Sequence, residues 1–334
     1  MNNIKKLQIF IGKNVMITGG LGFIGSNLAH ELVKLKSKVL IIDSLSPLYG
    51  GNMFNVSEIK DKCEIVIEDV RNQSLMNRLV KRQDFIFNLT GQVSHIDSLE
   101  DPLQDLESNC RTHLVLLEAC KNYNPKVKIV FAGTRGQYGK PVYLPVDEKH
   151  PMNPIEINGI NKMAAEAYHL LYYRNYGLKT TSLRLTNAYG QRHQMKNSKQ
   201  GFLNWFIRLA IDDKWIKIFG DGEQQRDFTH VEDVVKAFLI SAVSKKADGQ
   251  VFNLGSDKPV SIINVAKLMV ELSRSGEIKK IDFPETNRKI EVGDYHANYT
   301  KIKKILGWKP NISLMDGVKM TIEYYKKNRE HYWR

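Results

Sequence analysis

The chain has 334 residues, of which 42% are hydrophobic and 25% charged, and its formal net charge is +13. This is the composition of a globular protein long enough for one large domain or two interlocked ones. No apolar run approaches the ~20 residues of a membrane helix, so we expect no membrane span. The first ten residues, MNNIKKLQIF, lack the apolar core and cleavage site of a secretory signal, and we therefore expect a cytoplasmic protein.

The positive charge favours a solvated surface more than a polyanion partner. Basic residues occur singly or in pairs, such as Lys279-Lys280, among acidic ones, and no nucleic-acid motif is present. We therefore expect no nucleic-acid partner. The three cysteines, Cys63, Cys110 and Cys120, have neither zinc-site spacing nor the density of a disulfide scaffold. We expect buried thiols and no metal.

The apolar pattern predicts alternating strands and helices. NVMIT (14–18) reads as a strand that ends in a glycine cluster, and a helical pattern over 26–35 leads to a second strand, KVLIID (38–43). Further strands are predicted at 63–68, 84–90, 128–134, 180–187 and 250–255, with helices over 102–121 and 161–176. Such alternation predicts an α/β fold, a doubly wound parallel Rossmann sheet covered on both faces.

The pattern becomes less regular after residue 187, which predicts a smaller C-terminal lobe. We expect the Rossmann domain to comprise 1–187 plus about 228–256, because strand 250–255 is predicted to return to the first lobe. The substrate lobe would then comprise about 188–227 plus 257–334.

Gly19, Gly22 and Gly25 follow the first strand and open a helix, a context that suits a dinucleotide pyrophosphate. Without a Cβ the backbone can turn tightly and approach phosphates, and the helix N-terminus offers free N–H groups. The spacing is GxxGxxG and not the commoner GxGxxG, but the strand–turn–helix context supports the same interpretation.

Asp43, at the end of the second strand, is placed to meet the adenosine ribose hydroxyls. Its charge would repel a 2′-phosphate, and no Lys or Arg follows before Lys60, so we predict NAD over NADP. Asp69-Val70 follows the third strand, where it either contacts the adenine or forms an ordinary strand-ending turn.

With these residues in place, the chain resembles the extended short-chain dehydrogenase/reductase family, in particular its nucleotide-sugar epimerases and dehydratases. The resemblance covers nearly the whole length. Its motifs are TGGLGFIGSNL, LTGQVSHIDSLEDP (89–102), FAGTRGQYGKP (131–141), LRLTNAYGQR (183–192), GDGEQQRDFTHVEDVV (220–235), FNLGS (252–256) and ILGWKP (305–310). It implies NAD contacts at Phe23, Ile24 and Leu89 as well.

The family's catalytic group is a Ser or Thr with a Tyr and a Lys four residues apart on one helix face. The corresponding positions here are Thr134, Asn158 and Lys162, so an amide replaces the phenol. Asn158 can orient a sugar hydroxyl but cannot be the general base. Tyr138 belongs to a Tyr-Gly pair that in relatives lies near the site without being the base.

Three candidates remain for proton transfer. Lys162, desolvated beside a positively charged nicotinamide, would have a lowered pKa, although its ordinary role is to bind the nicotinamide ribose. His95 titrates in the right range but equally suits a loop-packing role. The third candidate is a water held by Thr134 and Asn158.

A second departure concerns the reaction. In the sugar 4,6-dehydratases that the chain resembles, an acidic pair follows the Thr, whereas Arg135-Gly136 stands here. Dehydration is therefore disfavoured, as is decarboxylation, since decarboxylating relatives carry a Glu nearby. Arg135 would bind an anionic group on the sugar or form a buried ion pair.

The resemblance also implies the substrate and the assembly. Asn187 and Arg226 are expected to meet the diphosphate of a nucleotide-diphosphate sugar, with a further contact from Arg288 or Lys289, and 200–206 to pass over the base. Helices 102–121 and 161–176 form a four-helix dimer bundle in relatives. Tyr168, Leu171, Tyr172 and Tyr176 line the second helix, which favours a homodimer.

The leading hypothesis is an NAD-dependent nucleotide-sugar epimerase, or 4-dehydrogenase, that transfers a hydride at a ring carbon, most simply C4. The alternative is a catalytically silent protein that holds NAD and a nucleotide-sugar, a reading that the missing Tyr motivates.

Overall fold

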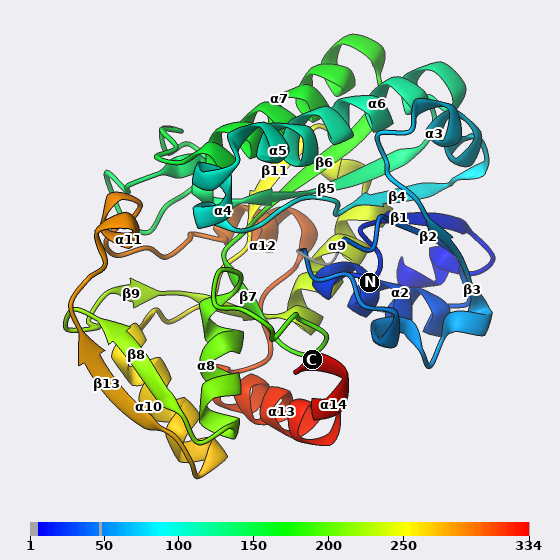
Figure 1. Cartoon of the computed structure of the whole chain (residues 1–334). Helices are drawn as coiled ribbons and strands as arrows, with labels where there is room; N and C mark the ends of the chain where they lie inside the picture. The colour runs from blue at the N-terminus through cyan, green and yellow to red at the C-terminus, as the bar shows by residue number, and fades with distance from the viewer. Residues whose placement is uncertain (1–5, 47–48, 334) are drawn as a thin grey trace.

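Seven parallel strands form the central sheet of the computed structural model, which describes residues 6–46 and 49–333 (Figure 1). Their spatial order is β11-β6-β5-β4-β1-β2-β3. The strands are β1 (Asn14–Thr18), β2 (Lys38–Asp43), β3 (Cys63–Ile67), β4 (Phe85–Asn88), β5 (Lys128–Thr134), β6 (Lys179–Leu185) and β11 (Gln250–Asn253). The predicted Rossmann fold is confirmed.

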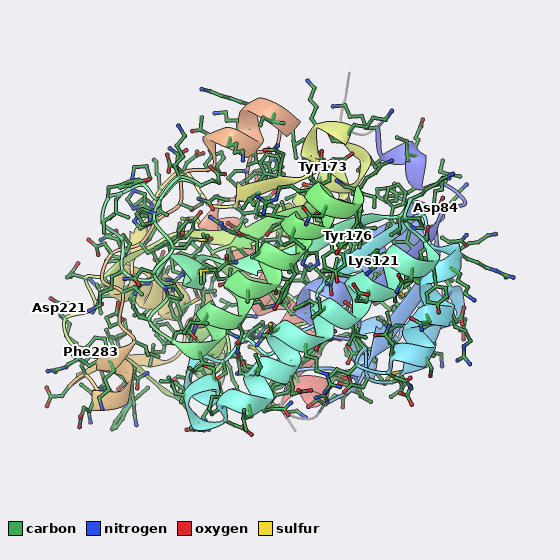
Figure 2. All side chains as sticks on the ribbon, turned by 90° about the horizontal axis from the view of Figure 1, so that it is seen from above. Asp84, Lys121, Tyr173, Tyr176, Asp221 and Phe283 are labelled. Atoms are coloured by element: carbon green, nitrogen blue, oxygen red, sulfur yellow. The ribbon has the colours of Figure 1, made fainter. Side chains whose placement is uncertain are left out.

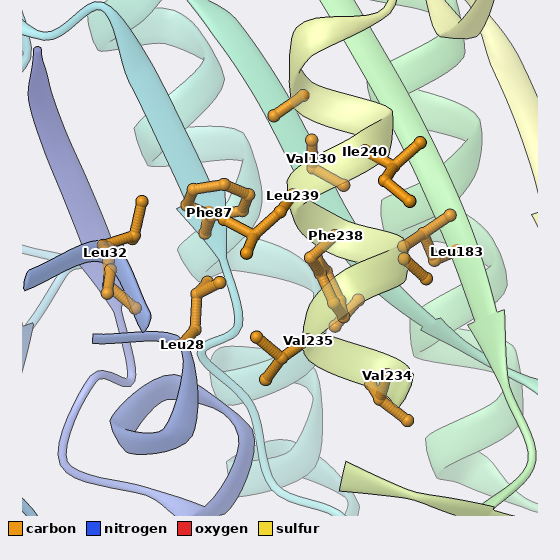
Figure 3. Packing of buried hydrophobic residues seen from close by; sticks show 14 of the residues in the cluster. Leu28, Leu32, Phe87, Val130, Leu183, Val234, Val235, Phe238, Leu239 and Ile240 are labelled. Atoms are coloured by element: carbon orange, nitrogen blue, oxygen red, sulfur yellow. The ribbon is translucent and has the colours of Figure 1, made fainter. Parts of the chain in front are cut away.

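Helices cover both faces of this sheet. On one face lie α2 (Phe23–Lys34) and α9 (Val231–Val243); on the other lie α3 (Gln73–Leu79), α5 (Pro102–Leu106), α6 (Thr112–Tyr123) and α7 (Ile157–Tyr176). Because side chains alternate along a strand, Val15 and Ile17 join the α2/α9 core while Met16 joins the opposite one. Figure 3 shows the first core, where Phe238 and Leu239 of α9 pack toward Phe87 of β4.

Two predicted elements are interrupted. The helix expected over 102–121 consists of α5, a π-helical segment η5 (Glu107–Arg111) and α6. The Thr112 hydroxyl bonds the carbonyl oxygens of both Glu107 and Ser108 at this wide turn. The strand expected over 180–187 ends at Leu185, and β7 (Asn187–Tyr189) pairs instead with β10 (Phe228–His230). The helix expected over 26–35 begins three residues earlier, at Phe23.

The smaller lobe has its own hydrophobic core. It contains α8 (Phe202–Ile211), α10 (Ile262–Ser273), α13 (Leu314–Lys327), α14 (Arg329–Tyr332) and the parallel pair β8 (Trp215–Phe219) and β13 (Glu277–Ile281). The helix α12 (Thr300–Leu306) lies between these elements in sequence, yet Ile302 and Leu306 pack in the α2/α9 core of the first lobe.

Shorter elements complete the chain. They are η1 (Gln8–Phe10), η2 (Met53–Val56), η3 (Lys60–Lys62), η4 (Val80–Arg82), α4 (His95–Glu100), η6 (Arg135–Tyr138), β9 (Gln225–Arg226), η7 (Lys245–Ala247), β12 (Val260–Ser261) and α11 (Glu285–Lys289). In the described part of the chain, no helix is both long and apolar enough to cross a bilayer. Of the cysteines, only Cys120 is buried; Cys63 and Cys110 are half-buried, which corrects the expectation of three buried thiols.

Candidate active site

A cavity of about 550 Å³ lies where the carboxyl ends of the sheet strands face the smaller lobe. Parallel α/β sheets place ligands at this edge. Its wall includes every predicted cofactor residue, namely Gly19, Gly22, Phe23, Ile24, Gly25, Asp43, Asp69, Val70, Leu89 and Lys162. It also includes His95, Thr134, Arg135, Asn158 and Asn187, so the fold brings most of the predicted site residues together.

The glycine-rich end is shaped by backbone. Gly19 has φ +69°, in the region that favours glycine. A Cβ on Gly25 would lie 2.7 Å from the Gly20 Cα and even closer to the Gly19 carbonyl oxygen. The first turn of α2 therefore packs directly on the preceding loop, and Phe23, Ile24 and Gly25 of this turn line the cavity, an arrangement that fits a dinucleotide pyrophosphate.

Asp43 is held in place by two backbone groups. Its carboxylate accepts hydrogen bonds from the Leu21 N–H at 3.0 Å and the Leu45 N–H at 2.8 Å. Burial nevertheless raises its pKa. A basic neighbour that sequence reasoning missed, Arg71, also lines this end, but it pairs with Asp69 at 2.6 Å and Glu107 at 3.1 Å. The arginine is thus neutralised and gives no free cation for a 2′-phosphate.

Lys162 lies at the inner end of the cavity on α7. Its Nζ is 3.4 Å from the carbonyl oxygens of Thr90 and Ala132 and 5.2 Å from the centre of the Phe131 ring. Burial lowers the pKa of Lys162 to about 8, partly opposed by the charge of Asp105. A Cβ on Gly91 would lie 2.7 Å from this Nζ, so the ammonium reaches its place only over a glycine.

The side chain of Asn158 belongs to a buried amide network. Its Nδ2 donates to the Gln92 carbonyl oxygen at 2.8 Å and lies 3.3 Å from Asp105 Oδ2. Asp105 also accepts from Gln92, Asn109 and Asn161, at 3.0, 3.0 and 2.7 Å. Burial raises the pKa of Asp105, and the amide donors partly offset this shift.

This network was not predicted, because Asp105 and Asn109 lie more than 45 residues before Asn158 and carry no recognisable motif. Asn109 lies in the π-helical segment η5, for which the sequence periodicity predicts an ordinary α-helix. The Asp105 network fixes the Asn158 amide to the protein interior.

Thr134 and Arg135 mark the boundary between β5 and η6. The Thr134 hydroxyl caps η6 by accepting from the Gly136 N–H at 3.1 Å. Arg135 stacks on Tyr295, with its guanidinium carbon 4.9 Å from the ring centre, and has no hydrogen bond or ion pair to any other described residue. Burial and the nearby Arg226 lower the pKa of Arg135. Of the two roles left open for Arg135, a buried ion pair is therefore not seen.

His95 and Glu156 meet on the same wall. His95 Nδ1 lies 3.1 Å from Glu156 Oε1. Glu156 caps α7 by accepting from the Gly159 N–H at 2.8 Å, and its Oε2 is 3.4 Å from the Ser98 hydroxyl. The histidine side chain is 42% exposed and the carboxylate only 4%. Glu156 was missed because a residue just before a helix reads simply as a cap.

The predicted diphosphate contacts lie at different depths. Asn187 is on the cavity wall and donates to the Asp227 carbonyl oxygen at 3.0 Å. Arg226 is buried behind the wall and pairs with Glu291 at 2.7 Å. Arg288 is exposed on α11, away from the lining. The Tyr138 hydroxyl is buried and bonds Asn253 at 2.7 Å; burial raises its pKa to about 12.

The predicted segment over the base, 200–206, divides between cavity and core. Gln200, Gly201, Phe202 and Leu203 line the cavity, whereas Phe206 is buried in the core of the smaller lobe. Among the described residues, no group of His, Cys, Asp or Glu is arranged to hold a metal ion.

Several known proteins that are similar to this chain are named as nucleotide-sugar epimerases or dehydratases. A model of the family described as GDP-mannose 4,6 dehydratase matches residues 16–321. The chain belongs to the extended short-chain dehydrogenase/reductase family. This is a family of nucleotide-sugar epimerases and dehydratases, and it also includes relatives of this chain that are named as decarboxylases.

Individual relatives match almost end to end. A protein of Methanocaldococcus jannaschii, provisionally named UDP-glucose 4-epimerase, is 35% identical over 319 residues, covering 94% of this chain and 99% of its own. The UDP-glucose 4-epimerase of Thermotoga maritima, solved with UDP-glucose, has a TM-score of 0.87 at 33% identity, covering 95% and 99%. The Thermus thermophilus UDP-glucose 4-epimerase, solved with NAD, has a TM-score of 0.84 at 27% identity, covering 94% and 99%.

Proposed function

We propose that the protein is an NAD-dependent nucleotide-sugar epimerase, or 4-dehydrogenase, that transfers a hydride at a sugar ring carbon, most simply C4, without a tyrosine base. One observation carries this proposal: the dinucleotide cavity keeps Thr134 and Lys162 at its inner end while position 158 holds no titratable group. The intact cofactor end argues for redox chemistry, and the missing phenol argues for a different proton acceptor.

The cofactor is NAD. Its pyrophosphate fits the turn from Gly19 to Gly25, and the Asp43 carboxylate meets the adenosine ribose hydroxyls, where it disfavours a 2′-phosphate. Asp69, Val70 and Leu89 complete the cofactor wall. When bound, NAD supplies the hydride acceptor. Lys162 then holds the nicotinamide ribose, and its positive charge beside the reacting carbon stabilises a developing oxyanion.

The substrate is a nucleotide-diphosphate sugar that enters between the lobes. Asn187 on the cavity wall is available to it, as is Arg135, whose guanidinium has no hydrogen bond or ion pair to another described residue. Arg226 would have to exchange Glu291 for a phosphate oxygen. A contact from Arg288 would require α11 to move toward the cavity. Because Arg135-Gly136 stands where dehydratases carry an acidic pair, epimerisation or net oxidation is favoured over dehydration.

The test is a panel of nucleotide-sugars incubated with the purified protein. We expect reduction of bound NAD at 340 nm and, for an epimerase, a product inverted at one carbon by NMR. A protein that binds nucleotide-sugars without reducing NAD with any of them would contradict the proposal.

A catalytically silent NAD and nucleotide-sugar binder is the second candidate, favoured by the fixation of the Asn158 amide to Gln92 and Asp105. Asn158→Tyr discriminates between the two. A silent site with otherwise competent geometry gains hydride transfer, whereas an enzyme adapted to Asn158 gains little or loses activity.

We further propose that α6 and α7, which lie side by side in Figure 2, form a homodimer interface. Leu103 of the neighbouring α5 exposes 72% of its surface, and Leu171 and Tyr176 of α7 expose 38% and 51%. Tyr172, by contrast, packs in the core beneath, so only part of the predicted aromatic stripe remains for a partner. Tyr176→Glu with Leu171→Glu should convert a dimer to a monomer in light scattering, while an unchanged mass would exclude this face.

A further inference from the structure

We propose that His95, positioned by the buried carboxylate of Glu156, is the group that exchanges the proton with the reacting sugar hydroxyl. This inference rests on the proposed function and names the acid/base that replaces the missing phenol. His95 would be the catalytic residue, and Glu156 a positioning residue that acts through it.

The first argument is the pairing itself. Glu156 Oε1 lies 3.1 Å from His95 Nδ1, within ion-pair distance, and that buried nitrogen makes no hydrogen bond to any described residue. A carboxylate at Nδ1 favours the tautomer whose proton is on Nδ1, which leaves Nε2 as a proton acceptor. Because the imidazole is partly exposed on the cavity wall, this acceptor is accessible to a ligand.

The second argument is the rigidity of Glu156. Its side chain is 4% exposed and is also bonded to the first turn of α7, the helix that carries Asn158 and Lys162. The His95–Glu156 pair is therefore fixed relative to the inner end of the cavity. A rigidly held orienting group is what general acid–base catalysis requires.

The third argument is the space that Gly136 provides. A Cβ on Gly136 would lie 3.2 Å from Glu156 Oε1, 3.5 Å from His95 Cε1 and 3.5 Å from the Thr134 hydroxyl oxygen. These three groups therefore all lie within 3.5 Å of the position that a Gly136 Cβ would take. Because Gly136 has no side chain, the His95 imidazole and the Thr134 hydroxyl can both lie close to this stretch of backbone, and both residues line the cavity that a sugar would occupy.

Lys162 is less suited to this role in the same site. Its Nζ faces the carbonyl oxygens of Thr90 and Ala132, which accept hydrogen bonds and so favour the ammonium form as a donor. The other charged groups near His95 are Arg135, on the same wall, and Asp97, on the same helix α4. Asp97 is already paired with Lys199 at 2.5 Å.

The proposed step is balanced in atoms and charge. The hydroxyl proton of the sugar passes to His95 Nε2 while the hydride on the same carbon leaves for the cofactor, so the alcohol is oxidised to a ketone and NAD is reduced. In an epimerase the reverse step returns the hydride to the opposite face, and the protonated imidazole returns its proton to the oxygen.

The experiment measures single-turnover reduction of bound NAD in the holoenzyme with the active nucleotide-sugar. We expect His95→Gln to slow reduction by roughly 1000-fold. The Kd of the nucleotide-sugar should change by less than about threefold, which is well below the tenfold change that corresponds to about 1.4 kcal/mol of binding free energy. Added imidazole should partly restore the rate in His95→Ala. His331→Gln, which removes a histidine that pairs with Glu330 on α14 outside the cavity lining, is the matched control and should retain the wild-type rate.

Glu156→Gln tests the positioning role, because an amide oxygen still caps α7 but no longer stabilises a protonated imidazole. We expect the acidic limb of the pH–rate profile to move to lower pH, with unchanged thermal stability. A purely structural role for Glu156 would leave the profile in place.

The outcomes separate the two proposals. If the wild type reduces bound NAD and the His95→Gln variant does so at the same rate, the His95 assignment is overturned and the proposed function stands. A His95→Ala variant without imidazole rescue, whose pH–rate profile matches that of the wild type apart from amplitude, also overturns that assignment. Absence of reduction in the wild type with every nucleotide-sugar that binds overturns the proposed function, and the His95 assignment with it.

Discussion

The two ends of the cavity differ in the groups that shape them: main-chain groups at one end and side chains at the other. At the glycine-rich end, main-chain groups of one continuous segment, from Gly19 to Gly25, define the shape. At the inner end, side chains from several separate segments define it, with Asp105 as the shared acceptor for Asn158 and its neighbours. A backbone-built site depends on few residues and keeps its sequence pattern, whereas a side-chain network can replace one member when the others adjust.

The largest expected effect is at the backbone-built end. Gly25→Ala places a Cβ against the Gly19 carbonyl oxygen and 2.7 Å from the Gly20 Cα, neither of which can move without opening the turn. We expect a cost of about 3 kcal/mol to the bound conformation and a loss of NAD affinity of roughly 100-fold, measured by calorimetry on cofactor-stripped protein.

Gly22→Ala is the matched control for this turn, because its added Cβ would meet only the Gly19 carbonyl oxygen at 3.3 Å. It should lose several-fold less affinity than Gly25→Ala. Equal losses would mean that the turn is not shaped by the Gly25 contact.

The next largest effect is on the pH dependence of the free energy of unfolding, and it comes from the buried Lys162. Its pKa is about 8 in the folded protein and near 10.5 in the unfolded chain, so the folded state binds fewer protons between these values. The free energy of unfolding should therefore rise as pH increases from 8 to 10.5, by about 3 kcal/mol. Lys162→Met should lack this increment in urea unfolding of the cofactor-free protein.

Lys319→Met, which removes an exposed lysine on α13, should keep the full pH dependence. If Lys162→Met and wild type give parallel curves over this range, the lysine is not desolvated as the structure indicates.

A smaller loss is expected at the centre of the amide network. Asp105→Asn puts an NH2 group among donors from Gln92, Asn109, Asn158 and Asn161, leaving at least one buried donor unpaired. We expect the free energy of unfolding to fall by about 2 kcal/mol, measured by urea unfolding. Asp101→Asn, which keeps a good helix cap on α5, should be nearly neutral.

The smallest expected effect is on the preference for NAD over NADP, and it comes from Asp43. Asp43→Asn retains an acceptor for one of the two backbone N–H groups but removes the charge that disfavours a 2′-phosphate. The preference for NAD over NADP should fall roughly tenfold, or about 1.4 kcal/mol, in parallel calorimetric titrations. Asp61→Asn, an exposed change in η3, should leave the preference unchanged. An undiminished preference would assign discrimination to another residue.

The same contrast explains what the sequence could predict. The strands were predictable because buried parallel strands are continuous apolar runs, and the glycine cradle because only glycine tolerates the contacts at Gly25. The partners of Asn158 and His95 were not predictable, because Asp105 and Glu156 approach them only through the packing of α5 and α7. The inward pairing of Arg226 with Glu291 depends likewise on a loop with no periodic pattern.

Gly91 links the lysine to the amide network through one small volume. A Cβ there would lie 2.5 Å from Asn109 Oδ1 and 2.7 Å from Lys162 Nζ, and the φ of Gly91 is +152°, a backbone conformation that favours glycine. Loss of the lysine alone would remove only one of these three constraints. A non-glycine residue at this position in a homologue would accordingly mark a site in which the backbone, the lysine and the Asn109 side chain have all been rearranged.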